Sequence, residues 1–178
     1  MGQSEIRKNI ISIRKNLTSS EILSKSQAIY ENLFSLPLIN QHQTFMVYKS
    51  FKGEVDTNAI IDRLISMQKV VLFPAIIDNF MVAVKPTSNV FVKDRYGIET
   101  PLSYTTKDTP NVVITPIVAC DVNKNRVGFG KGYYDKFFAS TPCLKIGICY
   151  DFQIVNNLPV NEWDVPLDII ITEKRIIK

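Results

Sequence analysis

The sequence has 178 residues, of which 46% are hydrophobic and 21% are charged, and its formal net charge is +4. These values predict one globular domain over residues 1–178, and no segment approaches the roughly 20 apolar residues that span a bilayer. Since no basic run carries interleaved aromatic residues, neither nucleic-acid binding nor a membrane role is expected.

The first predicted element is an amphipathic helix, which Ser4 is expected to cap. Its apolar side chains recur at helical spacing, at Ile6, Ile10, Ile13 and Leu17. Arg7 and Arg14 are seven residues apart, so they share one side of this helix. On spacing alone, that side is interpreted as a solvated basic face.

A second helix and a strand–helix–strand unit follow. Thr18-Ser-Ser-Glu21 is a capping-box pattern that starts a helix ending near Phe34. Residues 44–51 are rich in aromatic and β-branched residues, as expected for a strand. After a turn, a helix is predicted from Asn58 and a short apolar strand at 70–73, which together form a βαβ unit.

The rest of the chain predicts strands around one long connection. Residues 76–85 are interpreted as a hairpin, and residues 86–110 as a long, irregular, polar connection with a functional role. Apolar strands are predicted at 112–114, 145–150 and 167–172. The pattern predicts an α/β fold with a mostly parallel sheet flanked by helices, in a Rossmann-like three-layer arrangement whose ligand loops follow strand C-termini.

The most distinctive stretch is Arg126-Val-Gly-Phe-Gly-Lys-Gly-Tyr-Tyr-Asp135. Its alternate glycines permit left-handed backbone angles and close approach to a ligand. A short helix is predicted over residues 133–140; its N-terminus favours an anion, and Arg126 and Lys131 add two cations. The spacing matches neither a Walker loop nor the dinucleotide fingerprint. The stretch is interpreted as a phosphate-binding loop, with a flexible surface turn as the alternative.

This stretch resembles the signature of the 5-formyltetrahydrofolate cyclo-ligase (methenyltetrahydrofolate synthetase) family. The resemblance covers nearly the whole chain, including Phe51-Lys-Gly-Glu-Val-Asp-Thr57, Tyr96-Gly-Ile-Glu-Thr-Pro101 and Pro159-Val-Asn-Glu-Trp-Asp164. It implies ATP- and Mg²⁺-dependent conversion of 5-formyltetrahydrofolate, polyglutamylated forms included, to 5,10-methenyltetrahydrofolate. ATP would phosphorylate the formyl oxygen, N10 would attack, and ADP and phosphate would be released. A monomer is expected.

The resemblance also implies roles for individual residues. ATP would be bound by Gln3, Arg7, Arg126, Gly128, Phe129, Gly130, Lys131, Gly132, Tyr133 and Tyr134. Of these, Lys131, Tyr133 and Tyr134 would take part in catalysis. The folate would be bound by Lys49, Phe51, Glu54 and Trp163, and Mg²⁺ by Asp135 and Asp164.

The residues themselves leave alternatives open. Glu54 can be a turn carboxylate, Asp135 can serve only the helix dipole, and Asp164 can be a turn residue. Tyr133 and Tyr134 cannot both face inward on one helix, so one of them is expected in the core. A phosphosugar- or CoA-handling α/β enzyme and a non-enzymatic basic binding module are the two competing functional classes.

Three positions depart from the resembled pattern, which usually has Lys at Gln3, Gly at Lys124 and Phe at Cys120. Gln3 is expected just outside the first helix, on a mobile terminus, so ATP binding would depend more on Arg7 and the glycine stretch. The turn at Lys124 is expected to be stiffer, and Cys120 is expected to be a smaller core residue.

The cysteines and the histidine narrow the chemistry further. Cys120, Cys143 and Cys149 are odd in number and form no Cys-x-x-Cys motif, so neither a disulfide framework nor a zinc site is expected. His42 is the only histidine, which argues against imidazole catalysis and a His-ligated metal. A bound metal is therefore expected to be oxygen-ligated Mg²⁺. The polar N-terminus lacks a secretory signal, so a reducing cytoplasm is expected.

Overall fold

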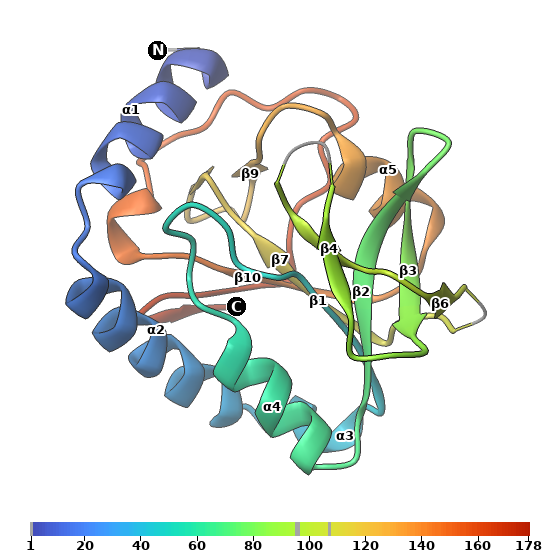
Figure 1. The fold of residues 1–178 in the computed structure, drawn as a ribbon. Helices are drawn as coiled ribbons and strands as arrows, with labels where there is room; N and C mark the ends of the chain where they lie inside the picture. Colours follow the sequence, from blue (N-terminus) through green and yellow to red (C-terminus); the bar gives the residue numbers. More distant parts are fainter. Residues whose placement is uncertain (1, 95–96, 107) are drawn as a thin grey trace.

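The computed structural model of the protein describes residues 2–94, 97–106 and 108–178, and within these ranges eight strands form one central sheet (Figure 1). They are β1 (Thr44–Val47), β2 (Val70–Ile77), β3 (Phe80–Pro86), β6 (Tyr104–Thr105), β7 (Val112–Pro116), β10 (Leu144–Ile148), β11 (Ile169–Ile171) and β12 (Ile176–Ile177). Their order across the sheet is β12-β11-β10-β7-β1-β2-β3-β6. The five strands from β11 to β2 are parallel, and the outer strands are antiparallel.

The order in which the chain visits these strands determines where a ligand can bind. From β1 the chain moves to β2 and β3 on one side, then returns to β7, β10 and β11 on the other. β1 and β7 are parallel neighbours, with Phe45 opposite Val112 and Val47 opposite Ile114. Their following loops diverge, so the carboxyl ends of β1 and β7 form the switch point at which open α/β sheets bind ligands.

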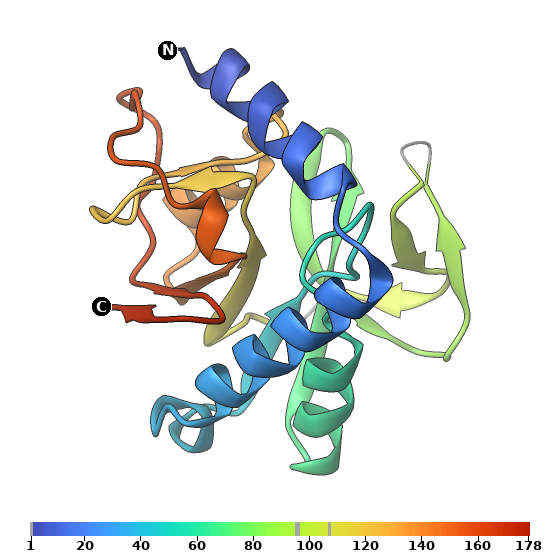
Figure 2. The ribbon, with the colours of Figure 1, turned by 90° about the vertical axis from the view of Figure 1, so that its left-hand side faces the viewer.

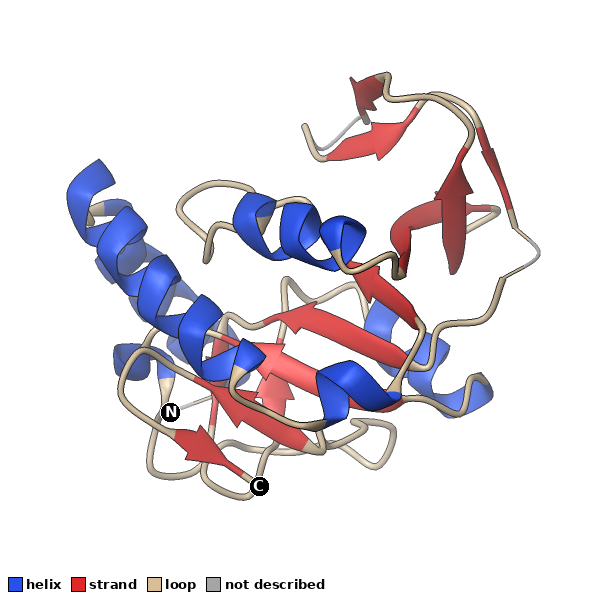
Figure 3. Ribbon diagram, turned by 90° about the horizontal axis from the view of Figure 1, so that it is seen from below, coloured by secondary structure: helices blue, strands red, loops and turns tan. Residues whose placement is uncertain are grey.

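Helices cover both faces of the sheet, which confirms the predicted three-layer α/β fold (Figure 3). They are α1 (Gln3–Lys15), α2 (Ser19–Phe34), α3 (Leu38–Gln41), α4 (Asn58–Ser66) and α5 (Tyr133–Ser140), with a 3₁₀ turn at Asp151–Gln153. On one face, Leu33 of α2 and Ile60 of α4 share a buried cluster with Phe45. On the other, Phe137 of α5 shares a cluster with Met46. Adjacent residues of β1 thus face opposite layers, as the period of two along a strand requires.

Helix α1 packs on a separate, smaller cluster. β8 (Ala119–Cys120) and β9 (Arg126–Val127) form a hairpin after β7, and Val127 packs with Ile6 and Ile10 of α1. In Figure 2, α1 (dark blue) crosses from the upper left towards the centre of the molecule. β9 is the start of the glycine stretch, so this contact brings α1 to that stretch.

Several local predictions are confirmed. Helix α5 spans the predicted residues, and α2 begins with the predicted capping box, in which Thr18 Oγ1 accepts from Glu21 N at 3.2 Å and Glu21 Oε2 accepts from Thr18 N at 2.8 Å. The predicted hairpin between β2 and β3 turns at Asp78 and Asn79, both with positive φ. Lys124 is also left-handed, at φ 68°, so this turn holds a side chain in a conformation that glycine adopts more easily. None of the helices in the described ranges is long and apolar enough to cross a bilayer.

The start and the buried side of the first helix were predicted wrongly. The N-cap is Gly2 rather than Ser4, and the helix begins at Gln3. Ile13 is 43% exposed, whereas Arg14 is only 2% exposed. The buried side follows Ile6, Ile10 and Arg14 at intervals of four, because α1 packs along the β8–β9 hairpin and the glycine stretch rather than on the main sheet.

The predicted irregular connection over residues 86–110 is also wrong. It contains an antiparallel ribbon of β4 (Phe91–Lys93) and β5 (Glu99–Pro101), which lies outside the main sheet at one end (Figures 2 and 3), followed by β6, which is the edge strand of the main sheet. The ring of Phe91 meets Phe73 of β2 edge to face at 5.1 Å. Tyr96, part of the resemblance, lies outside the described residues.

Candidate active site

Two loops meet beyond the carboxyl ends of β1 and β7. The first carries Glu54 after β1, and the second is the glycine stretch after β9 (Figure 1). Tyr150, which follows β10, donates its hydroxyl hydrogen to the Glu54 carbonyl oxygen at 3.1 Å. Tyr134 of α5 lies close enough to Glu54 for their charges to interact. The two segments that the sequence singled out therefore face one another at the switch point of the sheet.

The glycine loop, residues 128–132, is held by Arg7 of α1. Arg7 Nε donates to the carbonyl oxygen of Gly128 at 2.7 Å. Gly130 has φ +95°, and a Cβ atom built there would lie 3.3 Å from Arg7 Nη2. Gly132 has φ +66° and is the N-cap of α5. The loop thus adopts glycine-only backbone angles directly before a helix N-terminus, with an arginine packed against it.

Arg126 lies at the inner end of the same loop. Its side chain is buried and forms an ion pair with Asp135, at 3.1 Å between Nη2 and Oδ1. The guanidinium also lies over the rings of Tyr134 at 5.3 Å and Phe138 at 5.7 Å, while its Nε has no partner among the described residues. Asp135 therefore does more than serve the helix dipole, because it pairs with a buried cation.

The two tyrosines of α5 have different surroundings. Both tyrosines pack against the apolar cluster under α5, but only Tyr134 lies beneath Arg126 and within electrostatic reach of Glu54 in the described ranges. Burial raises the pKa of Tyr134 well above its usual value, with Arg126 opposing the shift. Tyr134 is the tyrosine that faces the interior of the site, as a neutral hydroxyl at neutral pH.

Glu54 is a buried carboxylate held by its own turn. Lys52 and Gly53 both have positive φ, at 49° and 75°, and this turn brings Phe51 N to 2.9 Å from Glu54 Oε2. Burial raises the pKa of Glu54 to about 7, while Arg14 and the Phe51 hydrogen bond oppose the shift. Glu54 is thus a turn carboxylate, and it is also poised to change charge near neutral pH.

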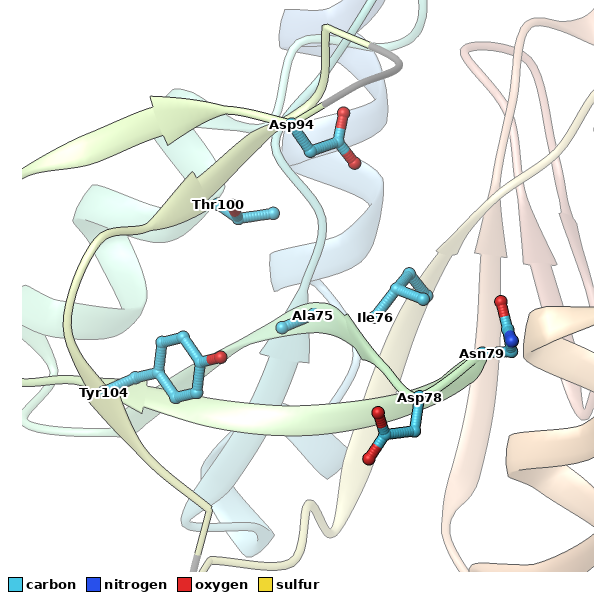
Figure 4. Close-up of a pocket in the computed structure, with 7 residues that line it drawn as sticks. All are labelled: Ala75, Ile76, Asp78, Asn79, Asp94, Thr100 and Tyr104. Carbon is cyan, nitrogen blue, oxygen red and sulfur yellow. The ribbon is translucent and has the colours of Figure 1, made fainter.

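The β4–β5 ribbon covers the loop after β1. Lys49 Nζ lies 4.9 Å from the centre of the Phe91 ring, and a Cβ atom at Gly97 would lie 3.3 Å from the Phe51 ring. A hollow of about 450 Å³ lies between the β2–β3 hairpin and the ribbon (Figure 4). Its lining residues are Ala75, Ile76, Asp78, Asn79, Asp94, Thr100 and Tyr104. None of the predicted site residues lines this hollow.

Gln3 and Asp164 lie together at the other side of the loop. Gln3 Nε2 donates to Pro159 O at 2.8 Å and to Asp164 Oδ2 at 3.2 Å. The prediction that Gln3 lies on a mobile terminus is therefore wrong: it is the first residue of α1 and is tied to residues 159–164. Asp164 Oδ2 also accepts from Asn161 N at 2.8 Å, which closes a turn. Trp163 is 69% exposed and makes no hydrogen bond or ring contact with Phe51 or Glu54 in the described part of the chain.

Comparison of the sequence with known proteins identifies the family of the chain. Residues 1–173 match the model of the 5-formyltetrahydrofolate cyclo-ligase family. The chain belongs to this family. It is 30% identical to 5-formyltetrahydrofolate cyclo-ligase of Haemophilus influenzae (94% of this chain, 96% of that one) and 29% identical to that of Escherichia coli K12 (92% and 96%).

Solved structures agree with the cyclo-ligase assignment. The NMR structure of Aquifex aeolicus 5,10-methenyltetrahydrofolate synthetase superposes with a TM-score of 0.89 at 31% identity, covering 100% of this chain and 93% of the other. The Mycoplasma pneumoniae 5,10-methenyltetrahydrofolate synthetase gives 0.79 at 26% identity, covering 97% and 99%. The cyclo-ligase fold is therefore present over the whole described chain.

The carboxylates of this cyclo-ligase fit the expected Mg²⁺. No group of three or more His, Cys, Asp or Glu residues is arranged around a metal position in the described ranges. Magnesium, however, is commonly held by one or two carboxylates together with phosphates and water. Both Asp135 and Asp164 lie near Arg126, and each retains one carboxylate oxygen without a protein partner among the described residues. These two oxygens have the right chemistry for a metal shared with phosphate.

The substitution Asp164→Asn tests whether Asp164 binds a metal in addition to closing its turn. Asp164→Asn keeps an oxygen that accepts from Asn161 N, so the turn is expected to persist, but it removes a charge that Mg²⁺ would use. We expect a higher Mg²⁺ concentration to be needed for half-maximal activity. The exposed Asp62→Asn on α4 is the matched control for loss of one charge. An Mg²⁺ titration that is the same for Asp164→Asn and wild type would leave Asp164 as a turn residue only.

One residue of the site was missed in the sequence. Arg14 was interpreted as part of a solvated basic face, but it is buried, and its guanidinium lies over the ring of Phe129 at 5.6 Å. Arg7, Arg14 and Arg126 therefore all meet the glycine loop. The available signal was the spacing of Arg7 and Arg14, which puts both on the side of α1 that faces the loop.

Proposed function

We propose that this cyclo-ligase converts 5-formyltetrahydrofolate to 5,10-methenyltetrahydrofolate at the expense of Mg·ATP, releasing ADP and phosphate. The observation that carries the proposal is the meeting of a cation-rich glycine loop with a buried carboxylate at one switch point. The loop suits the phosphates of ATP, and the carboxylate suits the pterin ring of the folate. Two substrates of these chemistries would be held end to end between Gly130 and Glu54.

The nucleotide end of the site is built for a polyanion. Arg7 and Arg126 flank the loop, Lys131 is exposed beside it, and α5 begins at Gly132. Backbone N–H groups and cations directed at one point are what binding of a triphosphate requires. Asp135 and Asp164 would hold Mg²⁺, which neutralises phosphate charge during transfer.

The folate end depends on Glu54. Ring nitrogens and the amino group of a pterin donate hydrogen bonds, which an ionised carboxylate accepts strongly. Lys49 and Phe51 precede Glu54 on the same loop and contact the β4–β5 ribbon, so they form the wall nearest to it. The exposed Trp163 would have to move, or the folate would have to reach it, for this residue to take part.

The chemistry requires positioning and charge stabilisation more than a protein nucleophile. The formyl oxygen attacks the γ-phosphorus, the bond to the bridging oxygen breaks, and ADP leaves with that electron pair. N10 then attacks the activated carbon, the C–O bond breaks, and phosphate leaves, taking up the proton that N10 loses. Tyr134, neutral and buried beside Arg126, would supply a hydroxyl donor to this step.

Phosphate release from Mg·ATP, measured with and without 5-formyltetrahydrofolate, tests the proposal. We expect release that depends on the folate, together with formation of the methenyl product. A phosphosugar- or CoA-handling enzyme would show no folate-dependent release, and a binding module would show no release at all. Either result would contradict the proposed function.

Arg7 offers a test of the nucleotide end alone. Arg7→Ala removes the hydrogen bond to Gly128 O and one cation, so ATP binding should weaken strongly while folate binding is retained. Gln3→Lys should instead tighten ATP, with a gain that shrinks as salt screens the added charge. Equilibrium binding of each substrate measures both effects.

Lys8→Ala is the matched control, since Lys8 is exposed and points about 100° away from Arg7 around the helix. If Arg7→Ala and Gln3→Lys both bind ATP like wild type, then α1 is not part of the nucleotide site.

A further inference from the structure

Arg14 is a buried cation whose Nε has no hydrogen-bond partner in the described part of the chain. It is 2% exposed, and its Nε is one of the few buried side-chain atoms that lack a hydrogen-bond partner among the described residues. No nitrogen of its guanidinium forms a hydrogen bond or an ion pair within residues 2–94, 97–106 and 108–178. Arg126, the other buried arginine, is paired with Asp135.

The position of Arg14 is between the two halves of the site. On one side, its guanidinium lies 5.6 Å from the centre of the Phe129 ring in the glycine loop. On the other, its Cγ lies 3.6 Å from where a Cβ atom of Gly53 would stand, next to Glu54 in the chain. No other arginine in the described ranges contacts both the glycine loop and the Glu54 turn.

The buried, unpaired Nε–H of Arg14 is costly, because neither water nor a protein acceptor in the described ranges satisfies this donor. The contact with Phe129 offsets part of this cost, and the nearby Glu54 charge offsets another part, but neither accepts its hydrogen bonds. Proteins keep such groups where a ligand supplies the acceptors. Because Arg14 lies between the glycine loop and the Glu54 turn, a ligand that spans these two segments could supply the missing acceptor.

We propose that Arg14 is a catalytic residue that donates hydrogen bonds to the phosphoryl group as it passes from ATP to the formyl oxygen. The inference rests on the proposed function, since it assigns a step of that reaction. During transfer, the P–O bond to ADP breaks and the P–O bond to the formyl oxygen forms. A planar fork of donors stabilises the equatorial oxygens of the transferring group without gaining or losing a proton.

The test compares Arg14→Gln and Arg14→Lys with the wild-type protein, and Lys15→Gln is the control that removes a charge from the exposed neighbour on α1. We expect Arg14→Gln to lower kcat by about 100-fold or more. The KM values for ATP and for the folate should change by less than about threefold, because the interaction is made during transfer. Arg14→Lys, which keeps the charge but not the fork, should recover part of kcat, and Lys15→Gln should match wild type.

Thermal unfolding separates this role from a structural one. Removing an unpaired buried charge should leave the melting temperature of Arg14→Gln equal to or above that of wild type. A variant that unfolds well below wild type would identify Arg14 as a structural residue and overturn the proposal. In Arg14→Ala, added methylguanidinium should restore part of kcat by occupying the vacated space.

Two kinetic results would also overturn the proposal. One is an Arg14→Gln variant whose kcat stays within about threefold of wild type. The other is an unchanged kcat with a raised KM for the folate alone, which would mean that Arg14 only positions Glu54. If wild type itself shows no folate-dependent phosphate release, it is the proposed function that fails, so the two failures are distinguishable.

Discussion

Gly130→Val is expected to reduce ATP-dependent turnover to the background level while leaving the fold intact. Gly130 has φ +95°, a conformation that a β-branched residue adopts only with strain. A Cβ atom there would lie 3.3 Å from Arg7 Nη2, and the two methyl groups of valine would extend further into this space. The change would therefore fill the proposed phosphate position and push Arg7 away from Gly128 O.

Turnover and thermal unfolding should be measured together for this variant. Gly130 is exposed, so the melting temperature should change little compared with turnover. Gly132→Ala is the comparison for backbone strain alone: Gly132 has φ +66°, but a Cβ atom there meets nothing within 4 Å. Its loss of activity should be clearly smaller. Near-normal turnover by Gly130→Val would remove the basis for phosphate binding at this loop.

Glu54→Gln is expected to weaken folate binding by about 1.5–3 kcal/mol, because a hydrogen bond to a charged acceptor is lost. ATP binding should be nearly unchanged, since Arg7 and the glycine loop do not contact the Glu54 carboxylate. Glutamine retains an oxygen that accepts from Phe51 N, so the turn should persist. Equal losses for both substrates would show that Glu54 acts on the structure as a whole.

The free energy of unfolding of Glu54→Gln should also differ from that of wild type in its dependence on pH. The pKa of Glu54 is raised from 4.5 to about 7 in the folded protein. Wild type therefore loses stability as pH rises from the unfolded value through about 7, because ionisation is then easier in the unfolded chain. Glu54→Gln lacks this loss, so its free energy of unfolding should exceed that of wild type by up to about 3 kcal/mol above pH 8. Below about pH 4 the difference should vanish.

Folate affinity should change in the opposite direction with pH. The ionised Glu54 is the better acceptor, so binding by wild type should strengthen as pH rises through about 7. Arg14, Tyr48 and Tyr134 are the other charged or titratable groups close to Glu54. Denaturation curves and folate titrations over the same pH range check both trends. A Glu54→Gln variant with the same pH profile as wild type would contradict the assignment of this ionisation to Glu54.

Features with a local cause could be predicted from the sequence. The capping box at Thr18 and the short helix after Gly132 depend on neighbouring residues, and both were found where expected. The parallel strands are apolar on both faces, and this is also visible in the chain alone. The location of the Glu54 turn and the glycine loop at the same edge of the sheet followed from a general rule, that parallel strands present their C-termini at one edge.

Features with a distant cause could not be predicted. The β4–β5 ribbon consists of short, half-exposed strands, and Phe91 is held by Phe73, eighteen residues earlier. Ile13 looked like a core residue and Arg14 like a surface one, because helical spacing does not tell which partner covers a face. Spacing also could not show that Gln3 reaches Asp164. These outcomes depend on which segments pack together in three dimensions.

The separate attachment of α1 has a consequence for the proposed nucleotide site. The apolar contacts of α1 belong to a small cluster of its own, apart from the two clusters that flank the sheet. A helix held by few apolar contacts can detach at a free energy well below that of global unfolding. Because α1 carries Arg7, such local opening would dismantle the proposed nucleotide site while the sheet stays folded. If ATP binds there as proposed, its binding and the ordering of the N-terminal helix are thermodynamically linked, and the affinity for ATP includes the free energy of docking that helix.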